Sequence, residues 1–231
     1  MVDFSKFVDP FKLIEAALNA VVDAFRAWRG FRLVIFGETE VGKTTLWHFL
    51  QSEKIVDPSK VDKTIEIDTL NKFRIKSIKL SFIKVGILAT DLPGDPEYRG
   101  TWREVLYNVK PHGIVFLIDH AKGKPASQKE VDLDRAKSHY DAFAHLAQLI
   151  FDNPEVTGAL RALAVVVNKI DALPSEIQGY GEVYERSGLN RQILRFDPLE
   201  NCRTTVFGCS ALYGTQVMPM VEWMVKGMAG R

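Results

Sequence analysis

Nine consecutive residues have the composition of a loop that binds phosphate. They are Gly37-Glu38-Thr39-Glu40-Val41-Gly42-Lys43-Thr44-Thr45, which fits the pattern G-x-x-x-x-G-K-[ST]. In such a loop the backbone N–H groups surround the phosphates of a nucleotide, the lysine reaches the outer phosphates and the next hydroxyl binds Mg²⁺. The pattern predicts Lys43 as a catalytic residue and Thr44 as a magnesium ligand. The other residues predicted to contact the nucleotide here are Gly37, Glu40, Val41, Gly42 and Thr45.

The surroundings of this loop support the same interpretation. An apolar, β-branched run from Phe31 to Phe36 precedes it, and a helical pattern runs from Lys43 to Glu53. The loop is therefore expected between a buried strand and a helix N-terminus. Exposed N–H groups and the helix dipole favour an anion at that place.

A second segment predicts which base is bound. Asn168-Lys169-Ile170-Asp171 follows a buried run from Leu163 to Val167. A carboxylate at Asp171 can accept two hydrogen bonds from the N1–H and the N2 amino group of guanine, a donor pair that adenine lacks. Asn168 is expected to bond the base or to brace the phosphate loop, and the stem of Lys169 to lie over the ring. Backbone N–H groups of Cys209-Ser210-Ala211, with Ser210 and Ala211 as contacts, are expected to complete a pocket for GTP or GDP.

A third segment, Asp91-Leu92-Pro93-Gly94, follows another apolar run. Its carboxylate is predicted to hold Mg²⁺, usually through a water, and the Gly94 N–H to meet the terminal phosphate. Thr64 is the predicted second hydroxyl on the metal, with Ser59 and Thr69 as nearby alternatives. The predicted magnesium ligands are therefore Thr44, Thr64 and Asp91.

Composition excludes several other classes of protein. The chain has 231 residues, of which 46% are hydrophobic and 26% charged, and its net charge is +1. This balance gives no reason to expect nucleic acid as a partner. Two cysteines make a disulfide framework unexpected and favour a reducing, cytoplasmic location. Apolar runs are too short to cross a bilayer, and the chain starts and ends without a signal peptide or lipidation pattern.

Alternation of strands and helices predicts an α/β fold with three layers, which together with the phosphate-binding loop resembles the P-loop NTPase arrangement. We expect a mostly parallel six-stranded sheet with helices on both faces. The predicted strands are Phe31 to Phe36, Asn71 to Ile78, Lys84 to Ala89, Gly113 to Ile118, Leu163 to Val167 and Thr204 to Phe207. The predicted helices are Lys43 to Glu53, Tyr98 to Val109, Gln128 to Phe151 and Thr215 to Met228. All the motifs fall at carboxyl ends of strands, where ligands bind in such sheets.

Residues 1–30 are predicted to form a separate N-terminal extension ahead of a domain spanning 31–231. Asp9 is a candidate N-cap and Gly30 a candidate C-terminal end of a helix. The apolar residues between them recur at helical spacing. This amphipathic helix is expected to pack on its own domain or on a second copy, or alternatively on a membrane surface. Its balanced charges disfavour the membrane. The basic row on the predicted strand from Asn71 to Ile78 fits a protected edge or, alternatively, a docking site for an acidic partner.

Taken together, the motifs resemble those of the Ras-like and especially the Arf-like small GTPases, over Phe31 to Met228. The closest likenesses are Gly42-Lys43-Thr44-Thr45-Leu46, Thr101-Trp102-Arg103 and Asn168-Lys169-Ile170-Asp171-Ala172-Leu173-Pro174. Val2 stands where that family has the glycine that accepts a myristoyl group. The resemblance implies a molecular switch in which GTP orders the segments 59–69 and 91–103, hydrolysis releases them, and a protein partner contacts them.

One departure from that family concerns hydrolysis. Asp95 stands where those proteins have the glutamine that positions the attacking water. Gly94 and Asp95 are therefore candidate catalytic residues, together with Lys43 and Thr64. A carboxylate near the terminal phosphate is repelled unless it faces away or is protonated, so we expect slow unaided turnover, on the order of 10⁻⁴ to 10⁻³ s⁻¹ or below. The alternatives are a scaffold locked on its nucleotide, with the N-terminal helix making partner or dimer contacts, and an ATPase or kinase. The five histidines are expected to be surface or packing residues.

Overall fold

Five strands of the described residues form one parallel sheet in the order β2-β1-β3-β4-β5. The computed structural model describes residues 31–52, 87–91, 99–121, 131–173 and 201–230, with three single positions at 193, 196 and 199. The strands are β1 (Phe31–Gly37), β2 (Ile87–Asp91), β3 (Gly113–Asp119), β4 (Ala162–Asn168) and β5 (Arg203–Gly208). Two of the three inner strands, β3 and β4, are buried along their whole length, as expected from their continuous apolar sequences.

Strand register brings the ends of these strands to one edge of the sheet. Asp119 at the end of β3 lies opposite Asn168 at the end of β4. On the other side, Gly37 at the end of β1 lies opposite Leu117. Asp91 at the end of β2 lies opposite Ile35. The segments that follow β1, β3 and β4 therefore leave the sheet as neighbours, although the chain between them is long.

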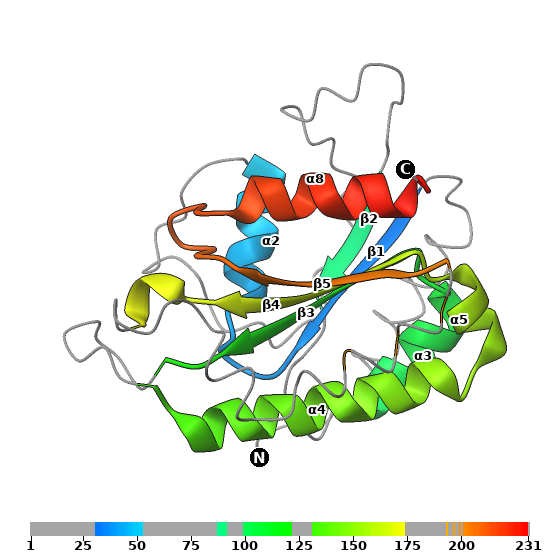
Figure 1. Ribbon diagram of the computed structural model, residues 1–231, viewed down its shortest axis with the longest axis horizontal. Helices are drawn as coiled ribbons and strands as arrows, with labels where there is room; N and C mark the ends of the chain where they lie inside the picture. The colour runs from blue at the N-terminus through cyan, green and yellow to red at the C-terminus, as the bar shows by residue number, and fades with distance from the viewer. Residues whose placement is uncertain are drawn as a thin grey trace, which may run out of the picture.

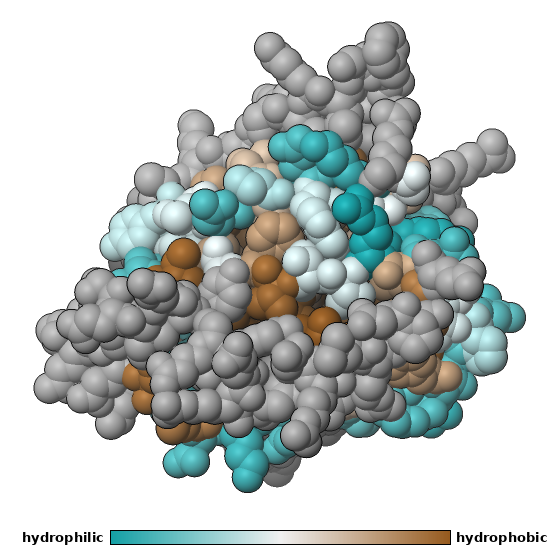
Figure 2. Space-filling view, viewed as in Figure 1, coloured by the Kyte–Doolittle hydropathy of each residue, from teal (hydrophilic) through white to brown (hydrophobic). Residues whose placement is uncertain are grey.

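Helices cover both faces of the sheet (Figure 1). On one face lie α2 (Lys43–Ser52) and α8 (Val217–Met228), and on the other α3 (Arg99–Val109), α4 (Leu133–Phe151) and α5 (Pro154–Ala159). A short 3₁₀ turn, η4 (Ile170–Ala172), follows β4. Along the lower edge of the molecule in Figure 2, where α4 runs in Figure 1, the coloured residues are mostly hydrophilic, with some hydrophobic ones toward the left.

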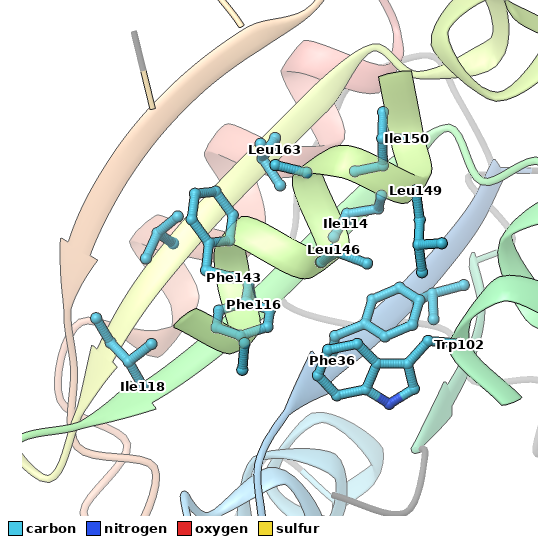
Figure 3. Close-up of a cluster of buried hydrophobic side chains, with 14 of the residues drawn as sticks. Phe36, Trp102, Ile114, Phe116, Ile118, Phe143, Leu146, Leu149, Ile150 and Leu163 are labelled. Carbon is cyan, nitrogen blue, oxygen red and sulfur yellow. The ribbon is translucent and has the colours of Figure 1, made fainter. Parts of the chain in front are cut away.

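The core beneath α3 and α4 is rich in aromatic side chains (Figure 3). Trp102 of α3 packs edge-on against Phe36 of β1, with ring centroids 5.4 Å apart, and against Phe116 of β3, at 6.1 Å. Edge-to-face pairs of this kind add about 0.5–1.5 kcal/mol each to the free energy of burial. The core therefore fixes β1 and β3, and with them the loops that follow these strands.

Five of the six predicted strands are confirmed within a few residues, and the α/β fold with helices on both faces is confirmed. The sixth, Asn71 to Ile78, lies outside the described residues, as do the N-terminal extension 1–30 and nearly all of 174–198. Among the helices that the structure describes, none is both long enough and apolar enough to cross a bilayer.

The predicted start of α4 at Gln128 is wrong. Helix α4 begins at Leu133, because the Asp132 side chain accepts a hydrogen bond from the Arg135 N–H and caps the helix. Val131 instead pairs with Ala121 in an isolated antiparallel bridge. Helix α8 likewise begins at Val217, two residues later than predicted.

Candidate functional site

The predicted phosphate loop has a backbone that few residue types can adopt. Positive φ angles occur at Gly37 (149°), Glu40 (64°) and Gly42 (94°). A β-carbon at Gly37 would lie 2.7 Å from the Leu117 carbonyl oxygen, and one at Gly42 would overlap the side-chain nitrogen of Asn168. Glycine is therefore required at both positions, for φ and for close approach of neighbouring atoms.

Lys43 lies where this loop meets α2. Its side chain is buried, and its ammonium donates a hydrogen bond to the Glu38 carbonyl oxygen at 2.7 Å. The residue begins α2, whose first turn contains no acidic side chain. The positive end of the helix dipole and a lysine thus meet at one point, which favours a bound anion. Thr44 and Thr45 follow in the same turn.

Asn168, at the end of β4, joins the loop to the segment after β5. Its side-chain nitrogen donates to the Val41 carbonyl oxygen at 2.8 Å, and its side-chain oxygen accepts from the Ala211 N–H at 2.9 Å. The residue is buried, so both bonds are shielded from water. Of the two roles expected for Asn168, this geometry is that of bracing the phosphate loop.

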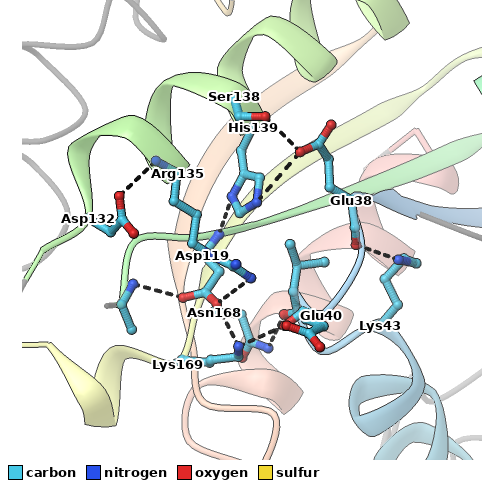
Figure 4. A network of polar contacts seen from close by, with 12 residues as sticks. Glu38, Glu40, Lys43, Asp119, Asp132, Arg135, Ser138, His139, Asn168 and Lys169 are labelled. Atoms are coloured by element: carbon cyan, nitrogen blue, oxygen red, sulfur yellow. Dashed lines mark hydrogen bonds and ion pairs between the residues drawn. The ribbon is translucent and has the colours of Figure 1, made fainter. Parts of the chain in front are cut away.

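Lys169 makes a second link to the same loop. It adopts a left-handed backbone conformation, with φ 59°. Its ammonium donates to the Glu40 carbonyl oxygen at 2.7 Å and forms an ion pair with Asp119 at 2.6 Å (Figure 4). Asp119 is buried, and it also pairs with Arg135 of α4 at 3.2 Å and accepts from the Ala121 N–H at 2.8 Å.

Sequence reasoning missed Asp119. A signal was available, because this carboxylate ends a continuous apolar strand, and the carboxyl ends of neighbouring parallel strands meet at one edge. In the structure it is the residue that orients the Lys169 ammonium toward the loop.

Asp171 lies in η4, immediately after this link. One of its carboxylate oxygens, Oδ1, is buried and has no hydrogen-bond partner within the part of the chain that the structure describes. A buried acceptor without a donor costs about 1–3 kcal/mol. A ligand that supplies N–H groups at this point would recover that free energy.

The neighbouring Cys209 contributes packing and a weak hydrogen bond. Its sulfur lies 3.6 Å from the Asn168 side-chain oxygen. Burial, and the charge of Asp171, raise the pKa of the Cys209 thiol to about 12, so the thiol remains protonated at neutral pH. Ser210 is also buried, and its hydroxyl oxygen accepts from the Tyr213 N–H at 3.3 Å.

The predicted magnesium ligands are described only in part. Thr44 stands in the first turn of α2, and Asp91 is the last residue of β2, the strand that neighbours β1. Hydroxyl and carboxylate oxygens are the donors that Mg²⁺ prefers, so these two residue types fit the metal. Thr64, Gly94 and Asp95 lie outside the described residues.

Two of the five histidines are fully buried, in agreement with a packing role. The His120 ring lies edge-on to the Tyr140 ring, and its Nε2 is 2.6 Å from the Tyr140 hydroxyl. Burial lowers the pKa of His120 to about 4, so its imidazole is neutral at pH 7. His139 is the second, and it contacts the phosphate loop, as described below.

Comparison with known proteins gives the family. The sequence profile of the ADP-ribosylation factor (Arf) family matches residues 18–228. The small COPII coat GTPase SAR1 of Nicotiana tabacum is 27% identical over 122 residues, which are 53% of this chain and 54% of that protein. The Ras-related protein Rab-33A of Mus musculus is 27% identical over 110 residues, 48% of this chain and 44% of that protein. The chain thus spans about half the length of the curated relatives it matches.

A solved structure shares the fold. The small GTPase Arl6/BBS3 of Trypanosoma brucei, solved with the nucleotide analogue GppNp, superposes with a TM-score of 0.59 at 15% identity, covering 87% of this chain and 98% of that one. At this identity the likeness concerns the fold alone. Family membership rests on the profile match, which covers most of the chain. The chain belongs to the Arf family, within the Ras-like superfamily of small GTPases.

Proposed function

We propose that this protein is a guanine-nucleotide-binding switch that binds GTP and GDP with Mg²⁺ and hydrolyses GTP to GDP and phosphate. The observation that carries the proposal is the joining of two segments at one edge of the sheet. Asn168 and Lys169 hold the loop through the Val41 and Glu40 carbonyl oxygens, at 2.8 and 2.7 Å. Asp171, whose buried Oδ1 has no hydrogen-bond partner among the described residues, stands directly beside this link. Membership of the Arf family supports the same function.

Guanine selectivity follows from the chemistry of Asp171. A carboxylate offers acceptors only, and guanine presents two N–H donors on one edge. Adenine has no such pair, so its binding would leave the carboxylate desolvated and unpaired. Mismatches of this type are worth roughly 10⁴- to 10⁵-fold in affinity at sites built around a hydrogen bond.

Mg²⁺ would be held by Thr44, Asp91 and Thr64 together with phosphate oxygens. The ion would supply positive charge to the phosphates during hydrolysis. In the chain itself, Lys43 binds the outer phosphates, and the N–H groups between Gly37 and Thr44 orient them. The positive φ angles of Gly37, Glu40 and Gly42 set the directions of these N–H groups.

Hydrolysis is proposed to be slow until a protein partner assists it. Asp95 stands in place of the glutamine that orients water in the related switches. We therefore expect unaided turnover on the order of 10⁻⁴ to 10⁻³ s⁻¹ or below. A partner is expected to bind the segments 59–69 and 91–103.

The test compares nucleotide affinities of the Asp171→Asn variant with those of the wild type. Calorimetric titration with GDP and with ADP should show a preference for GDP of at least about 10⁴-fold in the wild type. The variant should lose at least about 100-fold in GDP affinity without gaining ADP affinity, since an amide replaces one acceptor with a donor. Asp141→Asn, at an exposed site on α4, is the matched control and should behave as the wild type. Unchanged selectivity in Asp171→Asn would refute the assignment.

A further inference from the structure

One acidic side chain of the phosphate loop turns away from the loop and contacts α4. Glu38 is buried, and its Oε2 accepts a hydrogen bond from the Ser138 hydroxyl at 3.0 Å. The same oxygen lies 3.9 Å from Nε2 of His139 (Figure 4). Ser138 and His139 are consecutive residues of α4, about 100 positions further along the chain. A buried carboxylate in a phosphate-binding loop is unfavourable by itself, because it repels the negatively charged phosphates and loses its hydration. Contacts elsewhere in the protein must offset this cost.

The imidazole of His139 turns its Nε2 toward this carboxylate, at 3.9 Å, which is longer than a direct hydrogen bond. Its Nδ1 accepts a hydrogen bond from the Asp119 N–H at 3.0 Å, so the ring hydrogen of the neutral form stands on Nε2. Burial, followed by the charge of Arg135, lowers the pKa of His139 to about 4. At neutral pH a neutral N–H and a hydroxyl therefore face Glu38, and both come from α4.

These contacts complete the anchoring of the loop. In its second half, the Val41 carbonyl oxygen accepts a hydrogen bond from Asn168, and the Glu40 carbonyl oxygen accepts one from Lys169. Its first half is held through Glu38, whose carbonyl oxygen also accepts from the Lys43 ammonium at 2.7 Å. The backbone of Glu38 thus touches the phosphate-binding lysine, while its side chain touches α4. A change at the side chain alters the position of the carbonyl group, and the carbonyl group positions the lysine.

We propose that Glu38 is a positioning residue for the phosphates, held by the Ser138 hydroxyl of α4 beside the His139 ring, so that its charge stays away from them and the first half of the loop keeps its shape. Release of this contact would turn the carboxylate toward the phosphates and speed nucleotide loss. Helix α4 therefore sets the lifetime of the bound nucleotide. This inference rests on the guanine-nucleotide binding proposed above.

The test uses the full chain loaded with a fluorescent GDP derivative, whose release is followed after addition of excess GDP. Ser138→Ala removes the donor at an exposed helical position where alanine is well tolerated, so the variant is expected to fold. Release should become about tenfold faster, the effect of losing one hydrogen bond to a charged group. Lys137→Ala, the exposed neighbour on α4, is the matched control and should release GDP at the wild-type rate.

Two further measurements separate positioning from general stability. Ser138→Ala should lower the affinity for GDP more than the affinity for GMP, because the loop binds the outer phosphate. It should leave the preference for GDP over ADP unchanged. In a double-mutant cycle, Ser138→Ala should have no further effect once Glu38→Ala is present, because both remove one contact. Release from Ser138→Ala at the rate of Lys137→Ala, or additive effects in the cycle, would overturn the inference. A wild-type chain that binds no GDP would instead refute the proposed function.

Discussion

The side-chain nitrogen of Asn168 lies 2.8 Å from the carbonyl oxygen of Val41, although 127 residues separate the two in the sequence. The same side chain accepts from the Ala211 N–H at 2.9 Å. One amide thus holds together three segments that follow β1, β4 and β5. Since each segment is predicted to contact a different part of the nucleotide, the amide makes their relative positions a property of the folded chain.

Replacing Asn168 with alanine should therefore lower both stability and nucleotide affinity. The change leaves the Val41 carbonyl and the Ala211 N–H buried without partners, at about 1–3 kcal/mol each. We expect the free energy of unfolding to fall by about 2–4 kcal/mol, measured by urea denaturation. Asn108→Ala is the control, because the hydrogen bond of Asn108 to Glu104 is exposed, and should cost about 0.5 kcal/mol or less. Equal losses in the two variants would contradict the role of Asn168.

Replacing Gly42 with alanine tests the close approach of the loop to Asn168. A β-carbon would overlap the Asn168 side-chain nitrogen at a position where φ is 94°. Either the loop or the amide must move, so GDP affinity should fall by at least about 100-fold in a calorimetric titration, as expected when the phosphate-binding geometry is displaced. Gly158→Ala is a matched control, because a β-carbon there meets no atom within 4 Å. A Gly42→Ala variant that binds GDP as the wild type does would show that the loop is not held at this distance.

Asp119→Ala should lower the free energy of unfolding, because two cations pair with this carboxylate. Lys169 and Arg135 would both lose the buried carboxylate they share. Removal of one partner from a buried pair costs about 3–5 kcal/mol, and the partial exposure of both cations reduces this to about 2–3 kcal/mol. Glu222→Ala provides the contrast, since the ion pair of Glu222 with Lys226 is exposed on α8 and should contribute less than about 0.5 kcal/mol. Urea denaturation of the two variants distinguishes them, and similar midpoints would argue against a buried network.

Acid should destabilise the protein before its carboxylates titrate fully. Burial lowers the pKa values of His112, His120 and His139 from 6.5 to about 4. Between pH 4 and 6.5 the unfolded chain therefore binds more protons than the folded one, so stability is complete above about 6.5 and falls as the pH decreases toward 4. Each pKa unit corresponds to about 1.4 kcal/mol.

This pH dependence can be measured by urea denaturation at pH 7.5, 6 and 5. His139→Asn keeps an acceptor for the Asp119 N–H and removes one of the three proton-binding sites, so its stability should decline less steeply. A stability that is constant between pH 7.5 and 5 would show that these histidines are not held neutral by the fold.

Much of the fold and of the candidate site could be predicted from short sequence patterns. The described strands were predicted from short runs of apolar and β-branched residues, and β3 and β4, whose apolar runs are continuous, are buried along their whole length. The positions of Gly42, Asn168 and Asp171 at one edge followed from their places after such runs. These features depend on residues close to one another in the sequence.

Apart from the contact of Asn168 with the phosphate loop, features that depend on distant residues were not predicted. The contact of Glu38 with Ser138 joins side chains 100 positions apart, and no local pattern marks either one. Helix α5 was missed although Asn153 caps it and Pro154 opens it, because six residues are too few to show helical periodicity. The start of α4 depended on Asp132, whose capping hydrogen bond outweighs the helical pattern ahead of it.

The most direct test of the central claim is to identify the nucleotide that accompanies the protein through purification. The chain should be isolated with Mg²⁺ present, denatured with acid and its small molecules separated by ion-exchange chromatography. Our account predicts GDP or GTP, near one molecule per chain, released when the metal is chelated. Adenine nucleotides at that stoichiometry, or a folded chain that stays free of nucleotide when incubated with GDP and Mg²⁺, would contradict it.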